Sequence, residues 1–354
     1  MKTKEHSFIS SLFICLLYLP VLVTAECSCE NEVLSKDTAG NKTKALKYKF
    51  VAISSILMAG AVGVSLPIMA KKIPTFGPQN NIFFLIKAFA GGVILATAFV
   101  HILPDAYQSL TSPCLSEKPW GGFPFTGFLA MVSAILTMMM DTFATSFYKS
   151  SHFDKALPVN GDEEMLGENE GNVHVHTHPT HGHAHGSAES SHHLMTTQRI
   201  ISQVLEVGIV VHSVIIGVAL GASQNAKTIK PLVAALTFHQ FFEGMGLGGC
   251  ISQAKFKSRA IAMMLVIFSL TTPMGIALGM GISKIYNENS PKALVVEGIF
   301  DSLSAGILIY MSLVDLLGVD FMNPLMQTNL KLLLGSNLSL LLGAASMSLL
   351  AKWS

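Results

Sequence analysis

The sequence predicts an all-α integral membrane protein with eight transmembrane helices. Half of its 354 residues are hydrophobic and only 13% are charged, and the mean hydropathy is +0.51, which is too apolar for an ordinary soluble domain. The apolar residues also gather in eight runs, each long enough to cross a hydrocarbon layer of about 30 Å as a helix rising about 1.5 Å per residue. We expect these helices at about 50–70, 82–103, 123–147, 199–223, 232–252, 259–282, 293–318 and 332–351.

Charge and cysteine content exclude several classes of protein. The net charge of +1 is spread over the loops and forms no basic patch, so we expect no nucleic-acid partner. The five cysteines include no CxxC pair, which leaves zinc-finger and thioredoxin-type chemistry without support.

Residues 1–25 are typical of a signal peptide. Two lysines near the start precede an apolar stretch, and small residues lead up to Ala25. A first membrane anchor is the alternative interpretation of this segment. After cleavage, residues 26–49 would form an extracellular tail, in which Cys27 and Cys29 could form a disulfide with each other or with Cys114.

The expected spans divide the mature chain into four further parts. Helices 1–3 would occupy 50–148, a cytosolic loop 149–198, helices 4 and 5 residues 199–252, and helices 6–8 residues 253–354. The cytosolic loops of this topology carry more Lys and Arg than the short outer loops, as the positive-inside rule requires. Lysines just before the first span oppose this orientation. We nevertheless expect the N-terminal tail outside, because a signal peptide translocates the tail regardless of nearby charge.

The long loop carries a histidine-rich segment after an acidic patch. Its histidines alternate with Gly, Thr and Pro, a composition that cannot form a packed core, so we expect a flexible segment. Neutral imidazoles suit Zn²⁺, Cu²⁺ or Ni²⁺, and a regulatory metal-binding role is expected, with a plain solvated linker as the alternative. The histidines concerned are His174, His176, His178, His181, His183 and His185, followed by His192 and His193.

The fourth and fifth spans carry ionisable side chains where a membrane helix normally has none. A charge at the centre of such a helix costs about 2.5 to 3.5 kcal/mol on insertion scales, so a functional role is the first hypothesis. His239 and Glu243 stand one helical turn apart on one face, and Gln240 could add an amide oxygen. His212 of the fourth span, with Ser213 beside it, is the expected facing ligand. Together these residues predict a divalent-cation site.

Other acidic residues extend the pattern. His101 and Asp105 form another pair one turn apart in the second span, where Pro104 is expected to loosen the helix. Asp141 lies in the third span, and Glu206 lies about 120° around the fourth helix from His212. The seventh span adds Glu297, Asp301 and Asp315. Each residue alone could be interfacial, but together they suggest a series of cation-binding steps.

Several segments resemble the ZIP (Zrt/Irt-like) metal transporters, specifically their plant zinc- and iron-regulated branch. The fourth- and fifth-helix signatures are VHSVIIGVALGAS (211–223) and FHQFFEGMGLGG (238–249), and further similar segments are FVHILPDA (99–106), FSLTTPMGIALG (268–279) and EGIFDSLSAGILIYMSLVDLL (297–317). The resemblance implies eight helices with both termini outside, in a 3+2+3 arrangement with helices 4 and 5 between two three-helix units. It also implies movement of Zn²⁺, Fe²⁺, Mn²⁺ and similar ions into the cytosol.

The resemblance also assigns site residues. His212, His239 and Glu243 match the central transport-site ligands, and Gln240 lies beside them. His101 and Asp105 match residues near the outer mouth, and Asp141 matches the acid of the third helix. Many members of the family carry a second acid one turn after the fourth-helix histidine. This chain has no acid between His212 and Gly217, and it has Ser213 in place of an asparagine. We therefore expect a central site that binds a single ion.

The sequence therefore predicts a divalent transition-metal transporter, with Zn²⁺ as the first expected substrate and Fe²⁺ and Mn²⁺ as others. It predicts neither an enzyme nor a resident cofactor. The alternatives are a cation-diffusion-type metal exporter, for which six spans and paired HxxxD motifs would be expected, and a non-transporting metal receptor. A metalloprotease would need an HExxH motif, which this chain lacks around His239. We expect the protein in a lipid bilayer, in the plasma membrane rather than an organelle membrane. The sequence does not fix the oligomeric state, and a homodimer is one of the alternatives.

Overall fold

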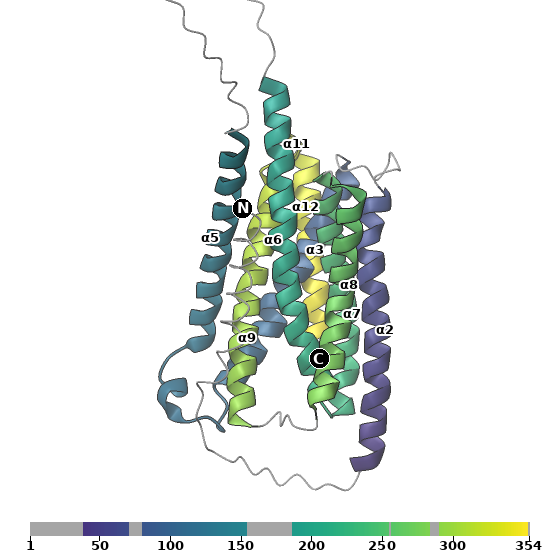
Figure 1. The fold of residues 1–354 in the computed structure, drawn as a ribbon, viewed down its shortest axis with the longest axis vertical. Coiled ribbons are helices and arrows are strands. Elements are labelled where there is room, and N and C mark those ends of the chain that lie inside the picture. Colours follow the sequence, from purple (N-terminus) through teal and green to yellow (C-terminus); the bar gives the residue numbers. More distant parts are fainter. Residues whose placement is uncertain (1–37, 71–79, 154–185, 255, 284–289, 353–354) are drawn as a thin grey trace, which may run out of the picture.

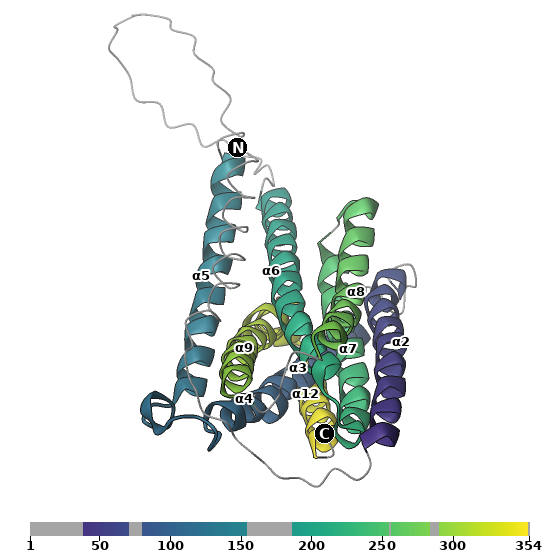
Figure 2. The same ribbon diagram turned by 60° about the horizontal axis from the view of Figure 1, so that its bottom comes forward.

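The computed structural model describes residues 38–70, 80–153, 186–254, 256–283 and 290–352. Within these ranges the chain is helical and contains no strand. The long helices lie side by side in one bundle, with α5 and α2 on opposite sides and α6 between them in both views (Figures 1 and 2). The signal peptide expected at 1–25 and the loop histidines at 174–185 lie outside the described residues.

The helices follow the predicted spans closely. In chain order they are α2 (Thr38–Ala70), α3 (Asn81–Ala96), α4 (Leu103–Leu110), α5 (Phe125–Phe153), α6 (Gly186–Ala222), α7 (Ala226–Gln253), α8 (Ser258–Ile282), α9 (Pro291–Tyr310), α10 (Val319–Phe321), α11 (Pro324–Thr328) and α12 (Leu330–Ala351). Segments of π-helix, η3 (Thr97–Ile102) and η5 (Met311–Gly318), join α3 to α4 and α9 to α10, and a short π-type turn, η4 (Glu117–Gly121), precedes α5. Each predicted span lies, to within two residues at its ends, inside one of these helices or inside a continuous run of helical segments.

Seven helices of the described chain are long and apolar enough to cross a membrane. They correspond to seven of the eight predicted spans. The remaining predicted span, 232–252, is the fifth in chain order and coincides with α7. This helix has 28 residues and does not belong to the seven. His239, Gln240 and Glu243 lie in the middle of α7, and these polar residues lower its mean hydropathy. The crossing of the membrane by α7 and the 3+2+3 arrangement remain predictions.

Two predicted boundaries differ from the structure. The first helix begins at Thr38, so part of the tail predicted at 26–49 is helical. The fourth helix begins at Gly186, whereas the sequence predicted a flexible loop up to residue 198. The flexible loop predicted for 186–198 is instead helical, because polar residues can continue the helix of the apolar run that follows them. His192 and His193 therefore belong to α6.

The π-helix η3 supports the predicted effect of the proline. Pro104 has no backbone N–H to donate, and the helix widens in the turn before it. The axis nevertheless continues through Thr97–Ile102 into α4, which gives one long element over residues 81–110. His101 is the residue of interest that this widened turn carries.

Packing divides the bundle into two helix groups. Helix α2 packs mainly against α7, and α6 against α8; we name α2, α6, α7 and α8 the first group. In the second group, α3 packs mainly against α12, and α9 against α4 and α5. The two groups meet mainly where α3 contacts α7 and α6 contacts α9.

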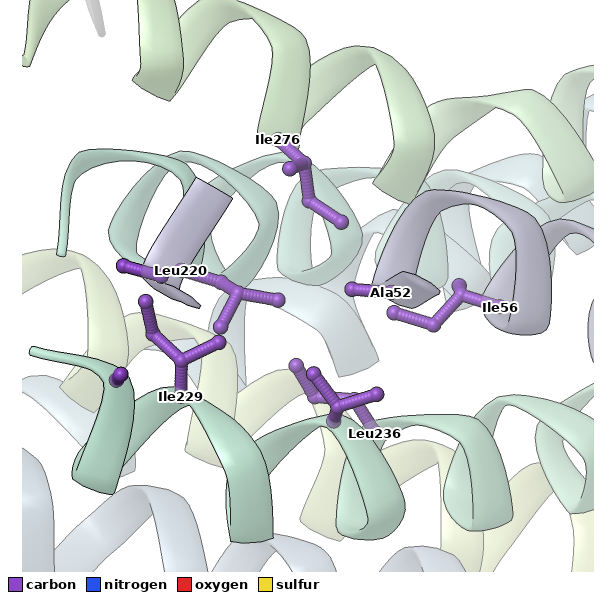
Figure 3. Close-up of a cluster of buried hydrophobic side chains, with 9 residues drawn as sticks. Ala52, Ile56, Leu220, Ile229, Leu236 and Ile276 are labelled. Carbon is purple, nitrogen blue, oxygen red and sulfur yellow. The ribbon is translucent and has the colours of Figure 1, made fainter. Parts of the chain in front are cut away.

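A buried apolar cluster forms the core of the first group. Its side chains come from all four helices and point toward one another (Figure 3). Ile56 from α2, Leu220 from α6 and Ile276 from α8 are fully buried, as is Ile229 from α7. Since these helices meet through the same core, the cluster favours their behaving as one rigid unit.

Glycines bring α6 and α8 into close contact. A Cβ on Gly279 would collide with the carbonyl oxygen of Val218, and a Cβ on Gly221 would collide with that of Ile276. Backbones can approach this closely only where the side chain is a hydrogen atom, as is common between membrane helices. The close contact fixes the position of α6, which carries His212, relative to α8.

A buried ion pair ties α3 to α10. Lys87 Nζ lies 2.9 Å from Asp320 Oδ1, and both side chains are almost fully inaccessible to solvent. Lys87 Nζ also donates to Gln253 Oε1 at the end of α7, at 3.5 Å. The free thiol of Cys250 is near enough to interact electrostatically with Lys87. No pattern in the sequence indicates this pair.

Cys114 forms a disulfide, as the sequence allowed. The other described cysteine, Cys250, is free. Cys27 and Cys29, which the sequence offered as partners, lie outside the described residues.

Candidate metal site

Three ligand side chains meet where α6 and α7 face each other. His212 comes from α6, and His239 and Glu243 come from α7, one turn apart as predicted. One potential ligand atom from each of the three lies within 4.8 Å of the others. His212 Nε2 is 3.9 Å from Glu243 Oε1, and the two imidazole centroids are 5.8 Å apart. All three side chains are buried, with exposures of 2%, 1% and 0%.

Several polar atoms of this cluster have no hydrogen-bond partner within the described part of the chain. They are His212 Nε2, His239 Nδ1 and both carboxylate oxygens of Glu243. Buried polar atoms are normally paired, because removing them from water without compensation costs about 1 to 3 kcal/mol each. A cation bound between the three side chains would compensate them together. Two imidazole nitrogens and a carboxylate are a donor set that fits Zn²⁺ and related divalent ions.

Neighbouring polar residues on the same helices play separate parts. Ser213 is buried next to His212, and its Oγ finds no hydrogen-bond partner among the residues described. The amide oxygen of Gln240 accepts a hydrogen bond from Thr272 Oγ1 on α8 at 3.1 Å, so this oxygen is already engaged. Glu206 is partly buried and lies outside the three-residue cluster. Roles for these three residues as ligands remain predictions.

His101 and Asp105 lie on one side of the cluster. His101 is buried, with 6% exposure, and is close enough to interact electrostatically with His212 and His239. It also interacts with Asp105, which is exposed. Asp105 in turn interacts with Asp301 of α9. The structure therefore brings His101 near the central histidines, and Asp105 lies beside His101 on its far side along the helix, at the exposed surface.

Asp141 lies with different residues. It accepts a hydrogen bond from the Tyr310 hydroxyl at 3.2 Å and interacts electrostatically with Asp315 of η5. Ser304 of α9 contacts His212, which fixes the level of the cluster along α9. Asp301 precedes Ser304 by about one turn and Asp315 follows it by about three turns. Acidic residues therefore lie on both sides of the cluster along this helix.

Two residues around the cluster were not predicted from the sequence. Ser304 contacts a cluster residue, with its Oγ 2.7 Å from His212 Nδ1, and Thr272 donates to Gln240 beside the cluster. Both lie in segments quoted for the ZIP resemblance. No sequence signal separated them from other helix serines and threonines, because such hydroxyls usually bond to the carbonyl of their own helix.

The comparisons with known proteins agree with the geometry. The sequence model of the ZIP zinc transporter family matches residues 46–351. The chain belongs to the ZIP family. It is 52% identical to "Zinc transporter 8" of Oryza sativa subsp. japonica, over 93% of this chain and 92% of that protein. It is 47% identical to "Zinc transporter 3" of Arabidopsis thaliana over the full length of both chains. The "Fe(2+) transport protein 1" of O. sativa is 45% identical, over 95% of this chain and 93% of its own.

Membership in the ZIP family confirms the resemblance drawn from the sequence. Together with the apolar helices it makes the chain a multi-pass membrane protein of a transporter family. Cation-diffusion-type exporters and metalloproteases, the other classes considered, are different families.

Proposed function

We propose that this ZIP protein carries divalent transition-metal cations, Zn²⁺ first among them, across a membrane into the cytosol. The observation that carries the proposal is the buried cluster of His212, His239 and Glu243, whose ligand atoms converge and lack protein partners in the part of the chain that is described. In this proposal α7 also crosses the membrane, as the fifth of eight transmembrane helices, and a single ion binds between α6 and α7 as the central step of transport.

The path would pass the acidic residues on both sides of the cluster. The cation would lose water near Asp105, pass His101, and reach the central ligands. Release toward the cytosol would follow a shift of the first helix group against the second, past Asp141 and Asp315. The separate core of the first group supports this, since rigid units with a limited contact surface can slide against each other.

The ligand set supports zinc without excluding other ions. Imidazole and carboxylate together are of intermediate softness, which accommodates Zn²⁺, Fe²⁺ and Mn²⁺. The names of the relatives point the same way, since they include zinc transporters and an Fe(2+) transport protein. Selectivity among these ions is a matter for direct competition experiments.

The loop and the membrane complete the proposal. We place the histidine-rich loop in the cytosol, where it would capture or sense the ion after entry, and the protein in the plasma membrane. The end of α5 and the start of α6, which flank the loop, lie at the same end of the bundle (Figures 1 and 2). Deletion of residues 172–193 should alter regulation or selectivity more than maximal uptake, and complete loss of uptake would contradict this role.

Uptake measurements test the function itself. Cells deficient in metal uptake would express the intact protein, His239→Ala or Glu243→Gln, and accumulation of labelled Zn²⁺, Fe²⁺ and Mn²⁺ would be compared at equal surface amounts. The proposal predicts uptake by the intact protein and its loss in both variants. Zinc binding without any flux in the intact protein would instead identify a metal receptor.

A further inference from the structure

The imidazole of His212 has a hydrogen-bond partner on the opposite helix group. Ser304 Oγ lies 2.7 Å from His212 Nδ1, and both residues are buried, with exposures of 0% and 2%. Ser304 belongs to α9 in the second group, whereas His212 belongs to α6 in the first. The other ring nitrogen, Nε2, faces Glu243 at 3.9 Å.

This contact determines which nitrogen can bind a metal. A neutral imidazole carries a proton on one nitrogen and a lone pair on the other. When Nε2 binds a cation, the proton resides on Nδ1, and Nδ1–H donates to the Ser304 oxygen. Hydrogen bonds of this kind hold the ring orientation and the tautomer of metal-binding histidines. We propose that Ser304 is a positioning residue for the metal site, which holds the His212 ring with Nε2 directed to the ion. The inference rests on the proposed role of His212 as a ligand.

The backbone around Ser304 is well anchored for this role. Ser133 Oγ of α5 donates to the carbonyl oxygen of Leu303, the preceding residue, at 2.7 Å. Two residues after Ser304, a Cβ on Gly306 would collide with the carbonyl oxygen of Ala130 in α5. Helix α9 is therefore held tightly against α5 on both sides of Ser304. The serine hydroxyl is presented from a rigid element, as a group that positions a ligand requires.

The bond also links the site to the relative position of the two helix groups. A slide of α6 along α9 by one helical turn, about 5.4 Å, would separate the two atoms beyond hydrogen-bonding distance. His212 would then lose its partner while His239 and Glu243 stayed together on α7. Ser304 therefore stabilises ion binding in the arrangement described here. When the groups shift and the contact to His212 is lost, the affinity of the site for the ion falls.

Four substitutions distinguish the effect of losing the hydroxyl from the effect of changing the side-chain volume. Ser304→Ala and Ser304→Val remove the hydroxyl, and Ser304→Thr keeps it in the same volume as valine. Ser302→Ala is the matched control, because Ser302 is a fully buried serine of the same helix whose Oγ donates to the Gly298 carbonyl of its own helix. For each purified full-length protein the Zn²⁺ affinity and the melting temperature would be measured, with the visible absorption of bound Co²⁺ as a report on ligand geometry. The apparent KM and maximal rate of Zn²⁺ uptake would be measured in cells.

The proposal predicts a loss of affinity that follows the hydroxyl. Removing an outer partner of a metal-binding histidine typically costs about 10- to 100-fold in affinity, so Ser304→Ala and Ser304→Val should raise Kd and KM by about that factor and change the Co²⁺ spectrum. Ser304→Thr should bind more tightly than Ser304→Val, and Ser302→Ala should match the natural protein. Unchanged affinity in Ser304→Ala, or equal losses in Thr and Val variants that follow their melting temperatures, would overturn it. His212→Ala, measured in parallel, separates the two claims. If that variant binds and transports Zn²⁺ normally, the proposed function fails; if it loses binding while Ser304→Ala does not, only the positioning role fails.

Discussion

Replacing Glu243 by glutamine removes the carboxylate of the candidate site while preserving the shape of the side chain. The three ligand atoms lie within 4.8 Å of one another, so a cation placed between them can lie within roughly 2.8 Å of all three. At that distance the attraction between a dication and a carboxylate is about 3 kcal/mol even with the screening of bulk water. This amounts to about 100-fold in affinity. The burial of Glu243 reduces screening, so we expect the loss to reach at least this size.

The assay is Zn²⁺ binding to the purified protein together with uptake in cells. Glu243→Asp keeps the charge on a shorter side chain and is the matched comparison; it should retain more affinity than Glu243→Gln. Equal melting temperatures would show that the variants are folded. Zinc affinity of Glu243→Gln within a fewfold of the natural protein would refute the electrostatic reasoning, because the site would then hold the ion without its carboxylate.

Three further predictions concern stability and pH. Asp320→Asn leaves the Lys87 ammonium buried without its carboxylate and should destabilise the protein by about 3–5 kcal/mol. The double variant Lys87→Met, Asp320→Leu should recover most of the lost melting temperature. An unchanged melting temperature in Asp320→Asn would show that the pair contributes little. Gly279→Ala should cost about 1–3 kcal/mol by forcing α8 away from the Val218 carbonyl, while Gly281→Ala, whose Cβ would meet nothing within 4 Å, should be nearly neutral; similar losses for the two would contradict the packing argument. Protons compete with metal for imidazole and carboxylate, so uptake at subsaturating Zn²⁺ should fall as the pH is lowered toward about 6.5, and a flat profile between pH 7.5 and 6 would contradict this.

The sequence predicted the helices well because a bilayer-length apolar run is a strong and nearly unambiguous pattern. It also pointed to the three side chains that converge, since His239 and Glu243 lie on one helical face and the segments around them and His212 resemble a known family. Metal binding by these side chains stays a prediction. The start of α6 at Gly186 could not be predicted, because polar residues that continue a helix look like a polar loop.

The residues that support the site were the hardest to predict. The contact between Ser304 and His212 depends on the packing of α9 against α6, and no local pattern encodes that geometry. The same holds for the ion pair of Lys87 and Asp320, which are far apart in the chain and meet only in the folded bundle. Long-range pairs of this kind depend on tertiary structure rather than on periodicity.

X-ray absorption at the zinc edge tests most directly whether the three residues share one ion. The purified protein, with the loop histidines replaced by serine so that they do not compete, would be loaded with one Zn²⁺ per chain. Two imidazole nitrogens at about 2.0–2.1 Å together with oxygen ligands are the predicted first shell, and one imidazole should be lost in either His212→Ala or His239→Ala. A spectrum that both substitutions leave unchanged would contradict a zinc site between α6 and α7.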